Sequence, residues 1–236
     1  MRRIQNLMEQ WLFIGPDNRQ EQVNLPHTWN AKDGQDGGND YYRGICHYEK
    51  TFEKPEFDPE TEEVYLEFLG VNASSDVTVN GKELAHHDGG YSTFRINITE
   101  VLEDQNKLEV TVDNSVNGKV YPQKADFTFY GGIYRDVRFL IVSKEHFDLD
   151  YLGSNGIKIT PEVKENEANV HIETFTNTEE AQVKVQIKDQ DGKVVVEGNG
   201  CDANLNIQNP IRWHGRKNPY LYTAVATLTV NGEVKD

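Results

Sequence analysis

Apolar and polar residues alternate with a period of two along most of this chain, and this pattern is typical of half-buried β-strands. Helical periodicity is nearly absent. The alternating segments are residues 62–71, 75–84, 107–114, 131–142, 156–163, 168–177, 181–198, 203–210 and 220–236. The pattern therefore predicts an all-β protein.

Tight turns separate several of these segments. Asn80-Gly81 lies between two alternating runs, and Asn-Gly is the strongest short hairpin signal because both turn residues need positive φ. The stretches "DQDGKVV" (189–195) and "VNGEVK" (230–235) have the same character. Short strands joined in this way predict β-sandwiches.

A spacer rich in charged and small residues, "SKEHFDLDYLGSNG" (143–156), divides the strands into two sets. We therefore predict two domains, residues 1–143 and 144–236. The last hairpin begins in "ATLTVNGEVKD", and its return strand stops after four residues. An unpaired edge of this kind predicts that the second sandwich is incomplete and that the chain is a piece of a longer protein.

Composition narrows the classes of partner. The chain has 236 residues, a net charge of -15 and 36% hydrophobic residues, so it can bury a core but repels nucleic acid and anionic membrane surfaces. No run approaches the ~20 apolar residues of a membrane span, and Glu9 interrupts the only stretch that resembles a signal peptide. These features predict a cytoplasmic protein that binds neither nucleic acid nor membrane.

Chemical motifs are scarce. The sequence contains no G-x-S-x-G, H-E-x-x-H, P-loop or G-x-G-x-x-G pattern. His86 and His87 are adjacent on a predicted strand, so they point to opposite faces and are poorly placed to chelate one ion. Cys46 and Cys201 form no disulfide framework, and Cys46 is expected to be a buried strand thiol.

Several segments together resemble the N-terminal part of glycoside hydrolase family two. They are "NLPHTWN" (24–30), "YYRGICHYEKTF" (41–52), the run from "VYLEFLGV" to "FRINIT" (64–99), "LEVTVDN" (108–114), "DFTFYGGIYRDV" (126–137) and "NPYLYTAVATLTVNGE" (218–233). Within the family, bacterial β-galactosidase is the nearest match. β-Glucuronidases typically have His-Arg-Pro where this chain has Tyr134-Arg135-Asp136.

The resemblance implies a jelly-roll, galactose-binding-like domain and an immunoglobulin-like sandwich, followed in the parent enzyme by a (β/α)₈ barrel. The barrel carries two catalytic glutamates of a retaining mechanism. This chain has no alternation of strands and helices, so the barrel is absent and no catalytic residue is assigned. We therefore expect a non-catalytic fragment of an enzyme that hydrolyses terminal β-galactosides. Its partner is expected to be the catalytic barrel of the same enzyme. The sequence does not decide whether the protein forms a homo-oligomer.

The resemblance also implies which residues approach the sugar. Asp126 corresponds to an aspartate that contacts the terminal sugar and, in some relatives, helps to hold sodium; its alternative role is to cap a loop. Arg43 and Tyr42 lie in the second loop that approaches the sugar. Arg43 stands in a region where some relatives have an asparagine, so domain packing or an ion pair is the favoured role for it, and packing at the domain interface is at least as good a role for Tyr42 as stacking on a sugar. No cofactor is expected within the fragment, whereas Na⁺ or Mg²⁺ is expected in the full-length enzyme.

The glycines Gly131 and Gly132 interrupt a strand-like segment, which predicts a sharp bend or a close approach of the backbone. Arg135 and Asp136 are expected to form a structural pair.

Two other functions remain open. The chain could belong to a β-glucuronidase, or it could be a free-standing carbohydrate-binding module. The module needs an aromatic platform within one domain, and the sequence alone locates none.

Overall fold

The computed structural model describes residues 2–31, 41–121, 125 and 127–236. The chain divides into two compact units, an N-terminal unit of residues 2–141 and a C-terminal unit of residues 142–236. Regular structure in the described residues consists of strands and two short 3₁₀ turns, η1 (Thr99–Val101) and η2 (Tyr151–Gly153). The predicted all-β class is confirmed.

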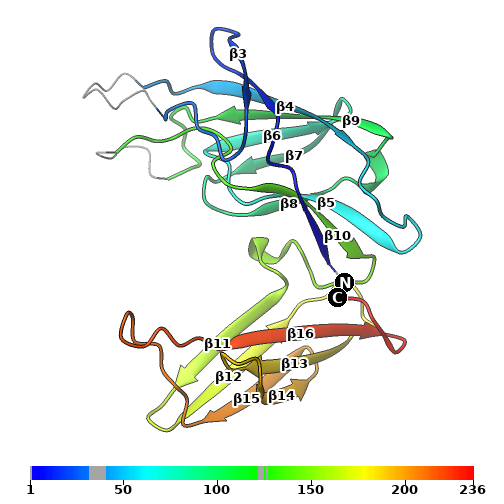
Figure 1. Cartoon of the computed structure of the whole chain (residues 1–236), viewed down its shortest axis with the longest axis vertical. Helices are drawn as coiled ribbons and strands as arrows, with labels where there is room; N and C mark the ends of the chain where they lie inside the picture. Colours follow the sequence, from blue (N-terminus) through cyan, green and yellow to red (C-terminus); the bar gives the residue numbers. More distant parts are fainter. Residues whose placement is uncertain (1, 32–40, 122–124, 126) are drawn as a thin grey trace. The chain divides into compact units, whose positions relative to one another are not determined.

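The N-terminal unit is a sandwich of two sheets, which lie one over the other in Figure 1. The four-stranded sheet has the order β1-β10-β5-β8, formed by Arg3–Asn6, Val137–Ser143, Glu62–Phe68 and Phe94–Asn97. The six-stranded sheet has the order β3-β2-β4-β9-β6-β7, formed by Gln20–Val23, Trp11–Ile14, Ile45–Glu53, Gln105–Asp113, Ser74–Val79 and Lys82–Asp88. All neighbours in the six-stranded sheet are antiparallel.

The core of this unit follows directly from the alternation in the sequence. Leu108, Val110 and Val112 of β9 are buried, and so are the alternate residues of β5. Each side chain of this kind contributes about 1.5–3 kcal/mol when it leaves water. The hydrophobic pattern therefore determines which face of each strand points inward.

The predicted hairpin at Asn80-Gly81 is confirmed. It joins β6 to β7, with φ of 52° at Asn80 and 77° at Gly81. The turn at Asn231-Gly232 has φ of 52° and 83° and joins β16 to β17. Glycine accepts these left-handed angles without strain because it has no Cβ.

A buried charge cluster joins three strands of the four-stranded sheet. The carboxylate of Glu67 in β5 accepts hydrogen bonds from Arg95 in β8, at 2.7 and 2.8 Å, and from Arg138 in β10. The side chains of Glu67 and Arg95 are 2% and 3% exposed. A buried carboxylate is tolerated only when it is paired in this way.

The C-terminal unit is a second sandwich of two sheets. One sheet has the order β11-β12-β15, formed by Ile157–Val163, Glu167–Thr174 and Asp202–Gln208. The other has the order β14-β13-β16-β17, formed by Val194–Asn199, Gln182–Lys188, Thr223–Val230 and Glu233–Val234. Its core gathers the inward residues of these strands around Ile172 and Leu228. Within the described ranges, no helix is long or apolar enough to span a lipid bilayer.

Candidate functional site

Loops from both sheets of the N-terminal unit meet at one end of its sandwich. Their described parts are residues 24–31 and 41–44 between β3 and β4, 69–73 between β5 and β6, 89–93 between β7 and β8, and 114–121, 125 and 127–136 between β9 and β10. Function in β-sandwiches is concentrated in such loops, because the sheets hold them in place while their sequence varies.

Asn30 lies at the centre of this loop cluster and is fully buried. Its Oδ1 accepts hydrogen bonds from the Gly131 amide at 2.7 Å and from Nδ2 of Asn114 at 3.2 Å. Its Nδ2 donates to the Tyr42 carbonyl at 2.9 Å. One side chain therefore joins the two described parts of the β3–β4 loop to two segments of the β9–β10 loop, which is far away in sequence.

Asn114, also fully buried, completes the connection. Its Nδ2 donates to the Phe129 carbonyl at 2.9 Å, and its Oδ1 accepts from the Gly44 amide at 2.8 Å. The carbonyl of Asn114 accepts from Nε of Arg43 at 2.9 Å. We call Asn30 and Asn114 the asparagine pair. Sequence reasoning missed this pair because nothing in the local pattern distinguishes a buried asparagine from an ordinary turn residue.

The two adjacent glycines permit close approach of the backbone, as predicted. A Cβ on Gly131 would lie 2.0 Å from Cζ2 of Trp29. Gly132 has φ of 132°, and a Cβ there would lie 2.5 Å from the His27 carbonyl oxygen. Gly132 also exchanges backbone hydrogen bonds with Asn72 at 3.0 and 3.1 Å. The segment 127–136 is therefore packed directly against two neighbouring loops.

The residues predicted to contact sugar have the following places. Arg43 donates to Asn114 and lies with its Cζ 4.8 Å from the ring centre of Phe129. The Tyr42 hydroxyl donates to the Ile45 carbonyl at 3.2 Å, and burial raises the pKa of this phenol. Asp126 lies outside the described residues. Sugar contact by these three residues, and sodium binding by Asp126, stay predictions.

Tyr42 lines a cavity of about 490 Å³ together with Trp29, Arg19, Glu21 and His27 among others. Trp29 stacks on the ring of Phe13 at a centroid distance of 6.1 Å. The Nδ1 atom of His27 is 2.8 Å from the Tyr48 hydroxyl, and burial lowers the pKa of this imidazole. This cavity contains both polar and aromatic groups.

A second cavity, of about 430 Å³, adjoins the first and shares Thr28 with it. We call it the aromatic cavity; it is lined by Thr28, Asn72, Tyr91, Phe127, Thr128, Phe129, Tyr130 and Tyr134. The residues Tyr91, Phe127 and Tyr130 are 58%, 54% and 40% exposed. The aromatic platform that the sequence could not locate is thus present within the N-terminal unit, where Tyr91 joins a cluster from the segment 127–134.

Arg135 supports this cavity from outside. Its Nη1 donates to the carbonyls of Tyr91 at 3.1 Å and Leu69 at 3.4 Å. The prediction that Arg135 and Asp136 form a structural pair with each other is therefore wrong. Arg135 donates to backbone carbonyls instead, and the Asp136 carbonyl accepts a hydrogen bond from the Leu69 amide at 3.0 Å.

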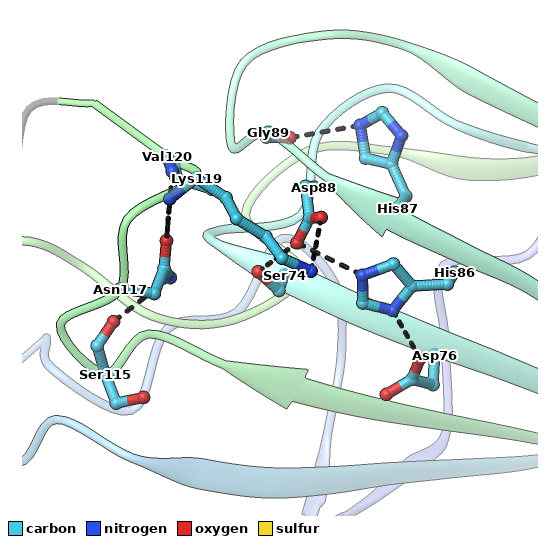
Figure 2. Close-up of polar contacts among 10 residues, drawn as sticks. All are labelled: Ser74, Asp76, His86, His87, Asp88, Gly89, Ser115, Asn117, Lys119 and Val120. Carbon is cyan, nitrogen blue, oxygen red and sulfur yellow. Dashed lines mark hydrogen bonds and ion pairs between the residues drawn. The ribbon is translucent and has the colours of Figure 1, made fainter.

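A charged network fixes the loop that follows β9, as Figure 2 shows. The Asp88 carboxylate accepts from Oγ of Ser74 at 2.7 Å, from Nζ of Lys119 at 3.0 Å and from Nε2 of His86 at 3.1 Å. Several contacts together lower the pKa of Asp88 to about 2, and the hydrogen bond from Ser74 has the largest effect. Nδ1 of His86 is 2.6 Å from Asp76, and this contact is the main cause that raises the pKa of the imidazole.

His87 points away from His86 and contacts the Gly89 carbonyl at 3.1 Å. The prediction that the two histidines do not chelate one ion is consistent with this geometry. Among the residues that the structure describes, no group of three or more His, Cys, Asp or Glu side chains could hold a metal ion.

Two sequence families match the chain. Residues 42–149 match the glycosyl hydrolase 2 galactose-binding domain-like family, and residues 155–236 match glycosyl hydrolases family 2. These matches agree with a galactose-binding-like sandwich followed by the immunoglobulin-like sandwich of that family.

Some individual relatives are named β-glucuronidase and others β-galactosidase. A β-glucuronidase from Bacteroides fragilis is 33% identical over 91% of this chain and 33% of its own length. A β-galactosidase from Thermoanaerobacter pseudethanolicus is 28% identical over all of this chain and 34% of its own length. The crystal structure of an FMN-binding β-glucuronidase from Facaelibacterium prausnitzii L2-6 superposes with a TM-score of 0.92 at 38% identity, over 100% of this chain and 38% of the other.

This chain thus spans about a third of the length of the curated relatives that it matches. The two family matches cover most of its residues in succession, and the fold agrees with both. The chain belongs to glycosyl hydrolase family 2.

Proposed function

We propose that this chain is the sugar-recognition and immunoglobulin-like part of a β-glucuronidase. The observation that carries this choice is the degree of similarity. Two β-glucuronidases are 38% and 33% identical over 91% or more of this chain, whereas two β-galactosidases are 28% identical over all of it and 32% identical over 71% of it. The sequence-based preference for β-galactosidase rested on Tyr134-Arg135-Asp136. In the structure these residues frame the aromatic cavity through Tyr134 and Arg135, so they are a weak guide to the sugar that is hydrolysed.

The geometry supports a recognition role for the loop cluster. The asparagine pair holds the segment 127–131 against residues 42–44, and Asp126 directly precedes that segment in the sequence. A carboxylate at this position can accept hydrogen bonds from sugar hydroxyls. Catalysis by two glutamates on a (β/α)₈ barrel would come from another part of the parent protein, because the described residues form only sandwiches and short turns.

The test compares hydrolysis of 4-nitrophenyl β-glucuronide and 4-nitrophenyl β-galactoside. Both this 236-residue chain and the full-length gene product are assayed. We expect turnover of the glucuronide by the full-length protein and none by the chain alone. Preference for the galactoside would contradict the proposed subclass, and turnover by the chain alone would contradict its non-catalytic role.

The role of Asp126 is tested in the full-length protein by Asp126→Ala. We expect kcat/KM to fall by roughly 100-fold, because charged hydrogen bonds to a bound sugar each contribute about 1.5–3 kcal/mol. The matched control is Asp104→Ala, which removes an exposed aspartate between η1 and β9 and should leave the rate unchanged. An unaltered rate in Asp126→Ala would remove Asp126 from the site.

A further inference from the structure

The aromatic cavity exposes ring surface that a folded protein ordinarily buries. Tyr91, Phe127 and Tyr130 come from two loops and are each at least 40% exposed. A volume of about 430 Å³ falls in the range of small-molecule sites, which are typically concave, mostly apolar and few in number. The cavity therefore has the size and the character of a ligand site.

The rings stand on a rigid frame. Phe127 packs against Phe129 at a centroid distance of 5.1 Å, and Phe129 is buried beneath the guanidinium of Arg43. The carbonyl of Tyr130 accepts from Nδ2 of Asn72 at 2.6 Å. Rings that are already held in place lose little conformational freedom when a ligand stacks on them.

The other loop is fixed in the same manner. The Tyr134 hydroxyl donates to the Gly90 carbonyl, and Arg135 donates to the carbonyl of Tyr91. The backbone that carries Tyr91 is thus attached to the segment that carries Tyr130. Both sides of the cavity belong to one preorganised unit.

The lining determines what can bind. The described residues that line the cavity are aromatic or are neutral threonine and asparagine. None of these described lining residues is charged, and the nearby Arg43 and Arg135 are engaged with Asn114 and with the carbonyls of Tyr91 and Leu69. Aromatic faces instead attract flat or apolar ring surfaces, while hydroxyl and amide groups at the margin suit neutral hydroxyls.

We propose that the aromatic cavity binds an uncharged six-membered ring with an apolar face, through stacking on Tyr91, Phe127 and Tyr130. This inference rests on the proposed function in one respect: the ring would be the neutral group attached to a β-glucuronide, not the glucuronate. Two kinds of group are uncharged six-membered rings with an apolar face: a neutral pyranose and an aryl group.

The test is a titration of the ¹⁵N-labelled 236-residue chain with three probes: methyl β-glucopyranoside, 4-methylphenol and glucuronic acid. We expect one neutral probe to shift the backbone amides of Thr28, Asn72 and Tyr130, and glucuronic acid to leave them unchanged. Which neutral probe binds tells the pyranose source from the aryl source.

Variants then assign the binding to the rings. Tyr130→Ala and Phe127→Ala should each weaken binding by roughly fivefold, since one aromatic contact contributes about 0.5–1.5 kcal/mol. Tyr130→Phe keeps the ring and should keep the affinity. Tyr121→Ala is the matched control, because Tyr121 is 79% exposed and does not line the cavity.

Three results would overturn the proposal: no shift with either neutral probe, equal binding of glucuronic acid, or full affinity in both alanine variants. The proposal would also be overturned if the alanine variants lowered the melting temperature of the full-length protein while no probe shifted the amide signals of the 236-residue chain. That result would identify the rings as a packing surface. Hydrolysis of galactosides by the full-length protein would overturn the proposed function alone, since the titration does not depend on the hydrolysed sugar.

Discussion

Replacement of Asn114 by alanine tests whether the asparagine pair organises the loop cluster. The variant removes the acceptor of the Gly44 amide and the donor to the Phe129 carbonyl. Asn30 keeps its bonds to Gly131 and Tyr42. The Asn114→Ala protein therefore has two unsatisfied backbone groups in a site where Asn114 itself is fully buried.

The expected loss of stability follows from these two groups. Each buried polar group without a partner costs about 1–3 kcal/mol, so two such groups should cost the N-terminal unit about 2–6 kcal/mol. That is a large share of the ~5–15 kcal/mol that stabilises a typical domain. A second variant, Asn30→Ala, should show a coupling of about 0.5–3 kcal/mol with the first in a double-mutant cycle, because the two amides contact each other.

Urea unfolding monitored by tryptophan fluorescence measures the loss. Trp11 and Trp29 report on the N-terminal unit, and a Trp213→Phe background removes the tryptophan of the other unit. The matched control is Asn6→Ala on β1, where the side chain is exposed; a change within about 0.5 kcal/mol is expected there. A loss below about 0.5 kcal/mol for Asn114→Ala would refute the reasoning.

Four further changes probe the frame around the site. Gly131→Ala should destabilise the N-terminal unit by about 1–3 kcal/mol, because its Cβ would meet Trp29 at 2.0 Å, as measured by urea unfolding. Glu67→Gln should cost about 3–5 kcal/mol, because it leaves buried arginines without their anion, as measured by thermal unfolding. Asp88→Asn should remove stability that the wild type has above the ordinary carboxyl pKa of 3.8 and loses as pH falls toward about 2. His86→Gln should remove stability that is present below pH 6.5 and lost as pH rises through the raised pKa of the folded state. Unfolding series across pH check both titrations.

The Gly131 and Glu67 variants have matched controls. Gly118→Ala adds a Cβ with nothing within 4 Å and should be neutral or slightly stabilising. Glu167→Gln breaks an exposed pair with Lys164 and should change stability by less than about 1 kcal/mol. Stability differences that stay constant with pH in the Asp88 and His86 variants would contradict the titration argument.

Local patterns predicted many strands of this fold, although not β1, β2 and β3. The alternation at Leu108, Val110 and Val112 predicted a strand with one buried face, and Asn80-Gly81 predicted a hairpin. Both features depend only on neighbours within a few residues, where the periodicity of a strand and the φ preference of glycine decide the outcome. Gly131 and Gly132 likewise predicted a close approach, although not the identity of Trp29 as the group approached.

The candidate site depended on contacts across long separations. Asn30 and Asn114 are 84 residues apart, and Tyr91 joins aromatic residues of the segment 127–134. A buried asparagine looks like a turn residue in sequence, and an exposed tyrosine looks like one that packs in a core. Burial and hydrogen-bond partners separate these cases, and both are set by how the chain returns on itself.

The sequence by itself therefore determined the all-β class, the hairpins and the family resemblance, because these follow from short-range pattern and from matched motifs. The tertiary structure alone decided that Arg43 supports Phe129, that Glu67 is paired with two arginines and that three aromatic rings line one cavity. The physical reason is that side-chain desolvation and hydrogen bonding depend on distance in space, which strand topology sets and local sequence does not.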